Sequence, residues 1–109
     1  MNTSPGFELH PEAAQDVLDI WEFIANENVV AAGRVRVDIL EAIRALVPFP
    51  HIGHRRKDLT SRPLRFHPVR NYLIAYAPDE SPLWVIAVLH GHRSPRVMAA
   101  ILRGRQEGI

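Results

Sequence analysis

The sequence predicts an α+β fold in which an antiparallel helical hairpin packs on a mainly antiparallel sheet. Two amphipathic helical periods occupy the first half of the chain, and short apolar, β-branched segments follow in the second half. Elements segregated in this way are typical of helices laid on one face of a sheet. With 109 residues, of which 47% are hydrophobic, we expect one domain over residues 1–109 with a real core.

The first half predicts an N-terminal strand and two helices. Phe7 and Leu9 indicate the strand, which His10-Pro11 closes because proline suits the first turn of a helix. Apolar side chains then recur every three to four residues to about Asn28, and again over residues 32–46. The join is so short that the helices must fold back on each other. The positions expected to face the sheet are Val17, Ile20, Trp21, Val35, Ile39 and Ile43.

The second half predicts three strands and a short C-terminal helix. Residues 64–67 alternate as a half-buried strand does, and residues 72–76 and 83–89 form a hairpin around a Pro-Asp-Glu-Ser-Pro turn. The run Trp-Val-Ile-Ala-Val-Leu is apolar on both faces, which predicts a central strand. We expect residues 94–105 to cover the face of this strand that the helices leave open.

The composition excludes several classes of protein. The chain has no cysteine, which rules out disulfides, thiol catalysis and cysteine-based zinc sites. The N-terminus lacks a basic region followed by an apolar one, and no stretch approaches the roughly 20 apolar residues of a membrane span. We therefore expect a cytoplasmic protein that is neither secreted nor inserted in a membrane.

The charge is uneven along the chain. Residues 1–33 hold six acids and no base, whereas the remainder holds thirteen basic residues against six acids, a net +7. Residues 55–70 hold six basic residues, namely Arg55, Arg56, Lys57, Arg62, Arg65 and Arg70, against the single acid Asp58. Such a stretch suits phosphates, acidic residues of a protein partner, or simply solvent. These alternatives stay open from the sequence alone.

Two further features carry chemistry. Helix geometry places Phe23 among acidic side chains, so it should be exposed, either as an ordinary surface aromatic or as an anchor for a partner. The segment His90-Gly91-His92-Arg93 ends the predicted central strand with both histidines on one face. Acid–base chemistry or simple hydrogen bonding would suit them. A metal would need a third ligand, for which His54 and His67 are only loosely placed, so we predict no metal site.

Four segments in order give the chain a family resemblance: HPEAAQDVLDIWEFIA, PFPHIGHRRKDL, NYLIAY preceded by arginine, and VIAVLHGHRSP. Over residues 7–98 the chain resembles the ParE-like branch of the ParE/RelE toxins. The resemblance implies a type II toxin neutralised by a cognate antitoxin whose C-terminal part wraps it. ParE-type members inhibit DNA gyrase, whereas RelE-type members cleave messenger RNA on the ribosome.

Two positions depart from the ribonuclease pattern of this superfamily. Where those members commonly have Tyr-Arg, this chain has Tyr72-Leu73, and no tyrosine occurs near Val97. We therefore favour a toxin that binds gyrase without catalysis. The alternative is a ribosome-dependent endoribonuclease that uses Arg65, His67, His90, His92 and Arg93. A third possibility is an inactive member that keeps only antitoxin binding.

The resulting site assignments concern binding surfaces. We assign antitoxin binding to Phe23, Arg55, Arg56 and Arg65, and target binding to His90, His92 and Arg93. For a toxin that acts by binding we expect no catalytic residue, no cofactor and no metal. Whether the chain also binds nucleic acid directly is left open.

Overall fold

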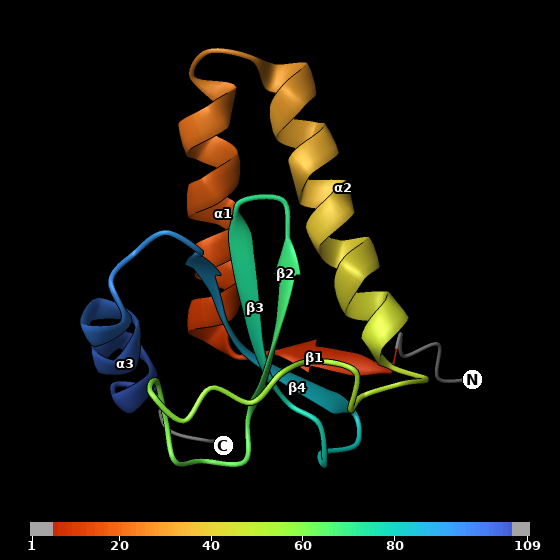
Figure 1. The fold of residues 1–109 in the computed structure, drawn as a ribbon. Helices are drawn as coiled ribbons and strands as arrows, with labels where there is room; N and C mark the ends of the chain where they lie inside the picture. Colours follow the sequence, from red (N-terminus) through yellow and green to blue (C-terminus); the bar gives the residue numbers. More distant parts are fainter. Residues whose placement is uncertain (1–5, 106–109) are drawn as a thin grey trace.

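The computed structural model describes residues 6–105 as a sheet covered on both faces (Figure 1). The helical hairpin lies on one face, and the fold class is the predicted α+β arrangement. Within residues 6–105 no helix combines the length and apolarity needed to cross a membrane. The elements are β1 (Phe7–Leu9), α1 (Pro11–Ala25), α2 (Val29–Leu46), β2 (Arg65–Val69), β3 (Tyr72–Ala77), β4 (Leu83–His90) and α3 (Pro95–Arg103).

The join between the helices differs from the prediction by about three residues on each side. α1 ends at Ala25 and α2 begins at Val29, because Asn28 caps the second helix instead of ending the first. Its side-chain Oδ1 accepts a hydrogen bond from Ala31 N at 2.9 Å, which satisfies one of the free amides of the first turn. The join therefore keeps the predicted length but lies about three residues earlier in the chain than the apolar pattern alone indicated.

The sheet has the strand order β1-β4-β3-β2. β1 runs parallel to β4, while β4–β3 and β3–β2 are antiparallel, so β4 lies inside the sheet as predicted. β1 pairs only with Leu83, Trp84 and Val85. Beyond Val85 this edge of β4 has no strand neighbour in the part of the chain that the structure describes, and Ile86 is an extra residue on β4 where the β3–β4 register shifts.

The helix face of the sheet buries the predicted apolar stripes. Val17 and Ile20 of α1 and Val35, Ile39 and Ile43 of α2 are all buried, and they pack in one cluster with residues of β3 and β4. Trp21 is the exception, because it is only half-buried and lies at the rim of the hairpin. Its place at the edge of the apolar stripe explains the difference from the prediction.

The opposite face of the sheet has its own apolar cluster. Met98 and Leu102 of α3 pack there, as expected of the C-terminal segment, and Ser94 caps the helix by accepting from Val97 N at 3.2 Å. The loop between α2 and β2 also contributes, through Leu59 and Leu64. Although this loop is rich in basic residues, two of its apolar side chains are buried in the second core.

Tyr76 fastens the start of that loop to the sheet. Its buried hydroxyl donates to Pro50 O at 2.7 Å and accepts from Gly53 N at 3.0 Å, and burial raises the pKa of Tyr76 above its usual value. Arg65 Nη1 donates to Gly53 O at 2.8 Å. A Cβ at position 53 would overlap the Tyr76 hydroxyl and meet Phe66 O at 3.0 Å. Glycine is therefore required for this close approach.

Substitution of Gly53 by alanine should destabilise the chain by about 2–3 kcal/mol, because the new methyl group displaces a buried, hydrogen-bonded hydroxyl. The free energy of unfolding in urea measures the effect. Gly33→Ala is the matched control, since a Cβ at Gly33 in α2 meets nothing within 4 Å. It should be neutral or stabilise by up to about 1 kcal/mol. Equal losses for both variants would contradict the Tyr76 contact.

Candidate functional site

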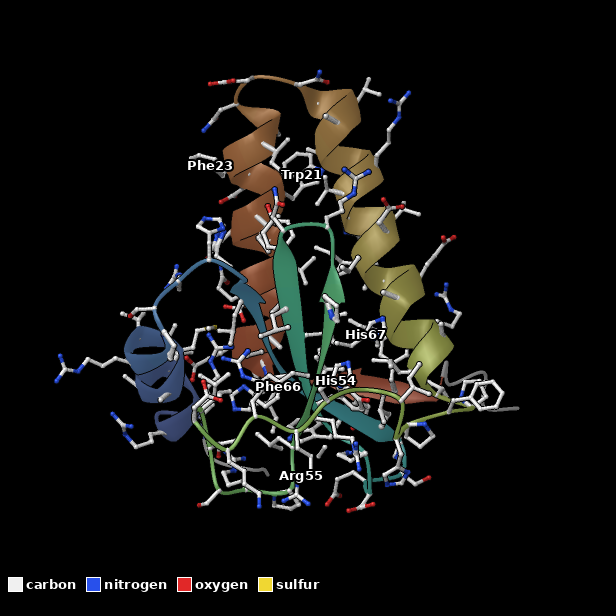
Figure 2. The ribbon with its side chains drawn as sticks, viewed as in Figure 1. Trp21, Phe23, His54, Arg55, Phe66 and His67 are labelled. Atoms are coloured by element: carbon white, nitrogen blue, oxygen red, sulfur yellow. The ribbon has the colours of Figure 1, made fainter. Side chains whose placement is uncertain are left out.

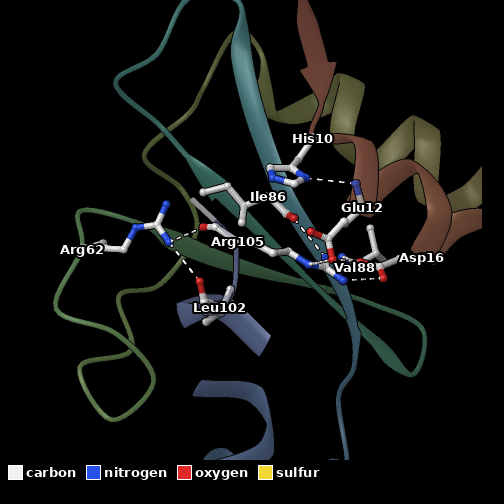
Figure 3. Close-up of polar contacts among 8 residues, drawn as sticks. All are labelled: His10, Glu12, Asp16, Arg62, Ile86, Val88, Leu102 and Arg105. Atoms are coloured by element: carbon white, nitrogen blue, oxygen red, sulfur yellow. Dashed lines mark hydrogen bonds and ion pairs between the residues drawn. The ribbon is translucent and has the colours of Figure 1, made fainter. Parts of the chain in front are cut away.

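A buried ion pair joins the residues that directly follow α3 to α1. Arg105, 8% exposed, donates from Nη1 to Asp16 Oδ2 at 2.5 Å and from Nη2 to Asp16 Oδ1 at 2.9 Å. The same Nη1 reaches Ile86 O at 3.1 Å, and Val88 N donates to Asp16 Oδ2 at 2.9 Å (Figure 3). These two side chains satisfy backbone groups of β4 just where its neighbour β1 has ended.

The charges in this cluster reinforce each other. The hydrogen bond to Asp16 raises the pKa of Arg105, although burial opposes the effect. Glu12 lies 3.7 Å from Arg105 Nε, which is the one buried side-chain nitrogen or oxygen among residues 6–105 without a hydrogen bond. Arg62 Nη1 donates to Leu102 O at 3.2 Å and Arg105 O at 3.0 Å. The end of α3 is thus held from two sides.

An open groove of about 350 Å³ lies between α1, the end of β4 and the α3 segment. We call it the end groove. Phe23 stands in its wall, 75% exposed, as the helix geometry predicted. Its apolar lining is accompanied by acids from α1 on one side and by arginines on the other. It is lined by Asp16, Asp19, Ile20, Phe23, Val88, Leu89, His90, Arg93, Ile101 and Arg105.

The histidines at the end of β4 form a ring cluster beside this groove. The His90 ring lies 5.2 Å from Tyr72 and 5.9 Å from His92, measured between ring centroids. Burial lowers the pKa of His90, and the nearby charges of Arg93 and His92 lower it further, against a smaller opposing effect of Asp16. The neutral form of His90, which can both donate and accept a hydrogen bond, is therefore favoured.

The residues of the ribonuclease alternative are not gathered in one place. His90 pairs with Tyr72, which pairs with Val69, whereas Arg65 pairs with Tyr76 near the other end of the sheet. The four residues from Val69 to Arg65 correspond to roughly 13 Å along the strand. His67 lies between these positions on β2, with β3 separating it from β4. Only His90, His92 and Arg93 share one end of the sheet.

The residues assigned to antitoxin binding lie at two ends of the molecule. Figure 2 shows Phe23 on the upper part of α1 and Arg55 at the opposite end. Arg56 forms a two-point ion pair with Asp58 at 2.9 and 2.8 Å. Arg55 and Arg65 line a second pocket of about 230 Å³, the loop pocket, together with His51, Pro63, Leu64, Pro78 and Asp79.

The outer side of the hairpin presents an apolar groove of about 540 Å³, the hairpin groove. Half-buried Trp21 and Leu40 line it, and Leu18, 46% exposed, stands beside them. Figure 2 places Trp21 between the two helices. The polar end of this groove is Arg36. Helical periodicity predicted that Trp21 faces the sheet, so this groove was not expected from the sequence.

Metal ligands do not converge anywhere in the described chain. Within residues 6–105 no group of three histidine, aspartate or glutamate side chains is placed to hold a metal ion. The polar groups at the sheet end instead offer hydrogen bonds and charge.

A family model described as "ParE toxin of type II toxin-antitoxin system, parDE" matches residues 7–95. The chain belongs to the ParE toxin family. It is therefore a toxin of a type II toxin–antitoxin system, and the partner of such a toxin is an antitoxin. No curated protein matches the chain. The matched region of this ParE-family toxin runs from β1 to the first residue of α3, so Arg96 to Arg105 lie beyond it.

The Arg105–Asp16 pair should be strongly coupled in a double-mutant cycle. Removing one partner of a buried pair costs about 3–5 kcal/mol because the other charge stays buried. We expect a coupling energy above about 2 kcal/mol for Asp16→Asn and Arg105→Gln in urea unfolding. The exposed pair Arg70–Asp38, 2.7 Å apart, is the control and should couple by less than about 1 kcal/mol. Additive losses at Asp16 and Arg105 would refute the coupling.

The lowered pKa of His90 gives a pH dependence with a definite sign. The unfolded chain binds this proton near the ordinary pKa of 6.5, and the folded chain binds it only at lower pH. The free energy of unfolding should therefore fall as pH drops through 6.5 and level off below the folded pKa. NMR titration of the His90 ring should show a midpoint below 6.5.

Variants at two neighbouring arginines separate the causes of the His90 shift. Arg93→Gln removes a charge that lowers the pKa, so the NMR midpoint should rise toward 6.5. Arg96→Gln, on the exposed side of α3, should leave it unchanged. A midpoint at or above 6.5 in the unaltered chain would show that the ring is not shielded as described.

Proposed function

We propose that this ParE-family toxin, a single-domain cytoplasmic protein, inhibits DNA gyrase by binding to it and has no catalytic step of its own. The observation that carries the proposal is the end groove, in which an exposed aromatic side chain stands beside a histidine and an arginine. Aromatic and arginine side chains beside an apolar floor are the usual anchors of protein–protein contacts.

The separation of the candidate catalytic residues supports binding over RNA cleavage. Cleavage needs one group to activate the 2′-hydroxyl, one to steady the phosphate and one to protonate the leaving oxygen. Arg65 donates to Gly53 O and lies far along the sheet from His90. Leu73 stands where the ribonucleases of the superfamily commonly have arginine. Of the candidate groups, only His92 and Arg93 lie near His90. In this proposal these three side chains form a contact surface.

The charges around the end groove also favour a protein over a nucleic acid. Asp19 lines the α1 side and α1 carries another exposed acid at Glu22, whereas Asp16 and Glu12 face Arg105. A phosphate backbone in the groove would lie against this acidic wall. A protein segment can instead match acids on one side and arginine on the other.

For the antitoxin we propose two contact regions joined by an extended path. An acidic stretch would lie on the loop pocket at Arg55 and Arg65, with Arg56 beside it. An amphipathic stretch would cover apolar side chains of the hairpin, namely half-buried Trp21 and the exposed Leu18 and Phe23. Because Phe23 also lines the end groove, an antitoxin bound there would exclude gyrase. Neutralisation would then be direct competition for one surface.

A supercoiling assay with purified gyrase tests the proposal. The toxin should block supercoiling, and Phe23→Ala should raise the concentration needed by about tenfold or more, as loss of an aromatic anchor does. Phe49→Ala is the matched control, since Phe49 is 64% exposed in the loop after α2, and it should leave inhibition unchanged.

The same preparation should be incubated with translating ribosomes. Codon-specific cuts in the message, abolished by His92→Ala in a folded protein, would establish the ribonuclease instead. Failure of the unaltered toxin to affect gyrase would also defeat the proposal.

A further inference from the structure

A cavity on the sheet face opposite the helices has an aromatic wall and an acidic mouth. Its volume is about 370 Å³, and Trp84 of β4 lines it together with Pro63, Leu64 and Pro82. The two carboxylates at this cavity are Glu8 and Glu80. We call it the Trp84 pocket. None of the surfaces used above for gyrase or the antitoxin includes these two glutamates.

The sheet register fixes Glu8 beside Trp84. The two residues are direct partners across the parallel β1–β4 pair, and paired residues of neighbouring strands project to the same face. On the other side of β4, Trp84 pairs with Ala77, whose small side chain leaves the indole accessible. The indole is half-buried, and its ring centroid lies 5.8 Å from that of His10. It is therefore held in place and still open to the pocket.

Besides its two carboxylates, the pocket is lined by one arginine. Arg62 lines the pocket, but its Nη1 donates to the carbonyls of Leu102 and Arg105 (Figure 3). No basic side chain of residues 6–105 forms an ion pair with exposed Glu8 or Glu80. Two such acids beside an indole make a negative site with an aromatic face, which suits a flat cation.

The pocket adjoins the basic surface already assigned to the antitoxin. Pro63 and Leu64 line both the Trp84 pocket and the loop pocket of Arg55 and Arg65. The two cavities therefore share a wall and carry opposite charge. A segment that lays an acidic residue in the loop pocket can continue into the Trp84 pocket, where a basic side chain matches the charge of Glu8 and Glu80.

We propose that the Trp84 pocket binds the guanidinium group of an arginine in the antitoxin, next to the acidic residues that meet Arg55. The guanidinium stacks on the Trp84 ring and donates to Glu8 and Glu80, as its planar group allows. The choice of partner rests on the proposed antitoxin surface, whereas the cation site itself does not. The two neighbouring pockets thus favour an antitoxin in which an acidic residue and an arginine lie close together along the chain, in either order.

NMR with a small probe tests the cation site without any antitoxin. N-acetyl-arginine amide should shift the indole N–H signal of Trp84 and leave that of Trp21 unchanged. The neutral isostere N-acetyl-citrulline amide should shift neither. The double variant Glu8→Gln/Glu80→Gln should lose the Trp84 shift, whereas Glu41→Gln on exposed α2 should keep it. Equal shifts with both probes, or none with arginine, would overturn the site.

Affinity for the cognate antitoxin tests the choice of occupant. The Glu8→Gln/Glu80→Gln variant should bind it about tenfold more weakly, with an unchanged melting temperature, and Glu41→Gln should bind normally. An unchanged affinity of the double variant would show that no antitoxin arginine enters the pocket. If the unaltered chain does not bind the antitoxin at all, the proposed antitoxin surface fails, and the arginine probe still decides the cation site.

Discussion

The bidentate pair between Arg105 and Asp16 holds together three parts of the fold that are distant in sequence. It connects the end of the α3 segment to α1, and through Ile86 O and Val88 N it closes the edge of β4 that β1 leaves open. An uncovered strand edge would invite pairing with other chains. Covering it with two charged side chains keeps the edge occupied and leaves a groove above it. His90, Arg93 and Phe23 line this groove together with both members of the pair.

The two faces of the sheet are covered by different elements, which expose different kinds of surface. The helix face carries the larger apolar cluster and exposes the hairpin groove and Phe23 on its outer side. The other face is closed by α3 and by the loop that Tyr76 and Gly53 fasten. That loop brings a basic pocket and an acidic one next to each other. A partner that wraps the chain therefore meets apolar surface in one region and alternating charge in another.

The sequence was a good guide wherever a pattern is local. Helical periodicity located both helices and the exposure of Phe23, and the two-sided apolar run placed β4 inside the sheet. The predicted positions of the helix ends were less accurate, because asparagine at position 28 could either end the first helix or cap the second. Trp21 lies at the edge of the apolar stripe of α1. There, a rotation of the helix about its axis by a few tens of degrees decides whether the side chain faces the core or the hairpin groove.

Contacts that join distant residues were not predictable in the same way. Asp16 looks like one of several acids on a polar helix face, and nothing near Arg105 marks it as buried, because the two are 89 residues apart. The placement of Phe23 and His90 around one groove likewise depends on how α1 packs on the sheet, and the pairing of Glu8 with Trp84 depends on strand order and register. The sequence around Gly53 gave no signal either, because the need for glycine in this loop comes from the hydroxyl of Tyr76, which lies in β3.

Hydrogen–deuterium exchange of the full chain, alone and with purified gyrase, tests the central claim most directly, because it reports where the target touches the toxin. Slower amide exchange is expected in residues 16–23 of α1 and 86–93 at the end of β4 when gyrase is added. Slower exchange confined to the loop of residues 50–64, or no change in any segment, would contradict the end groove as the target-binding surface.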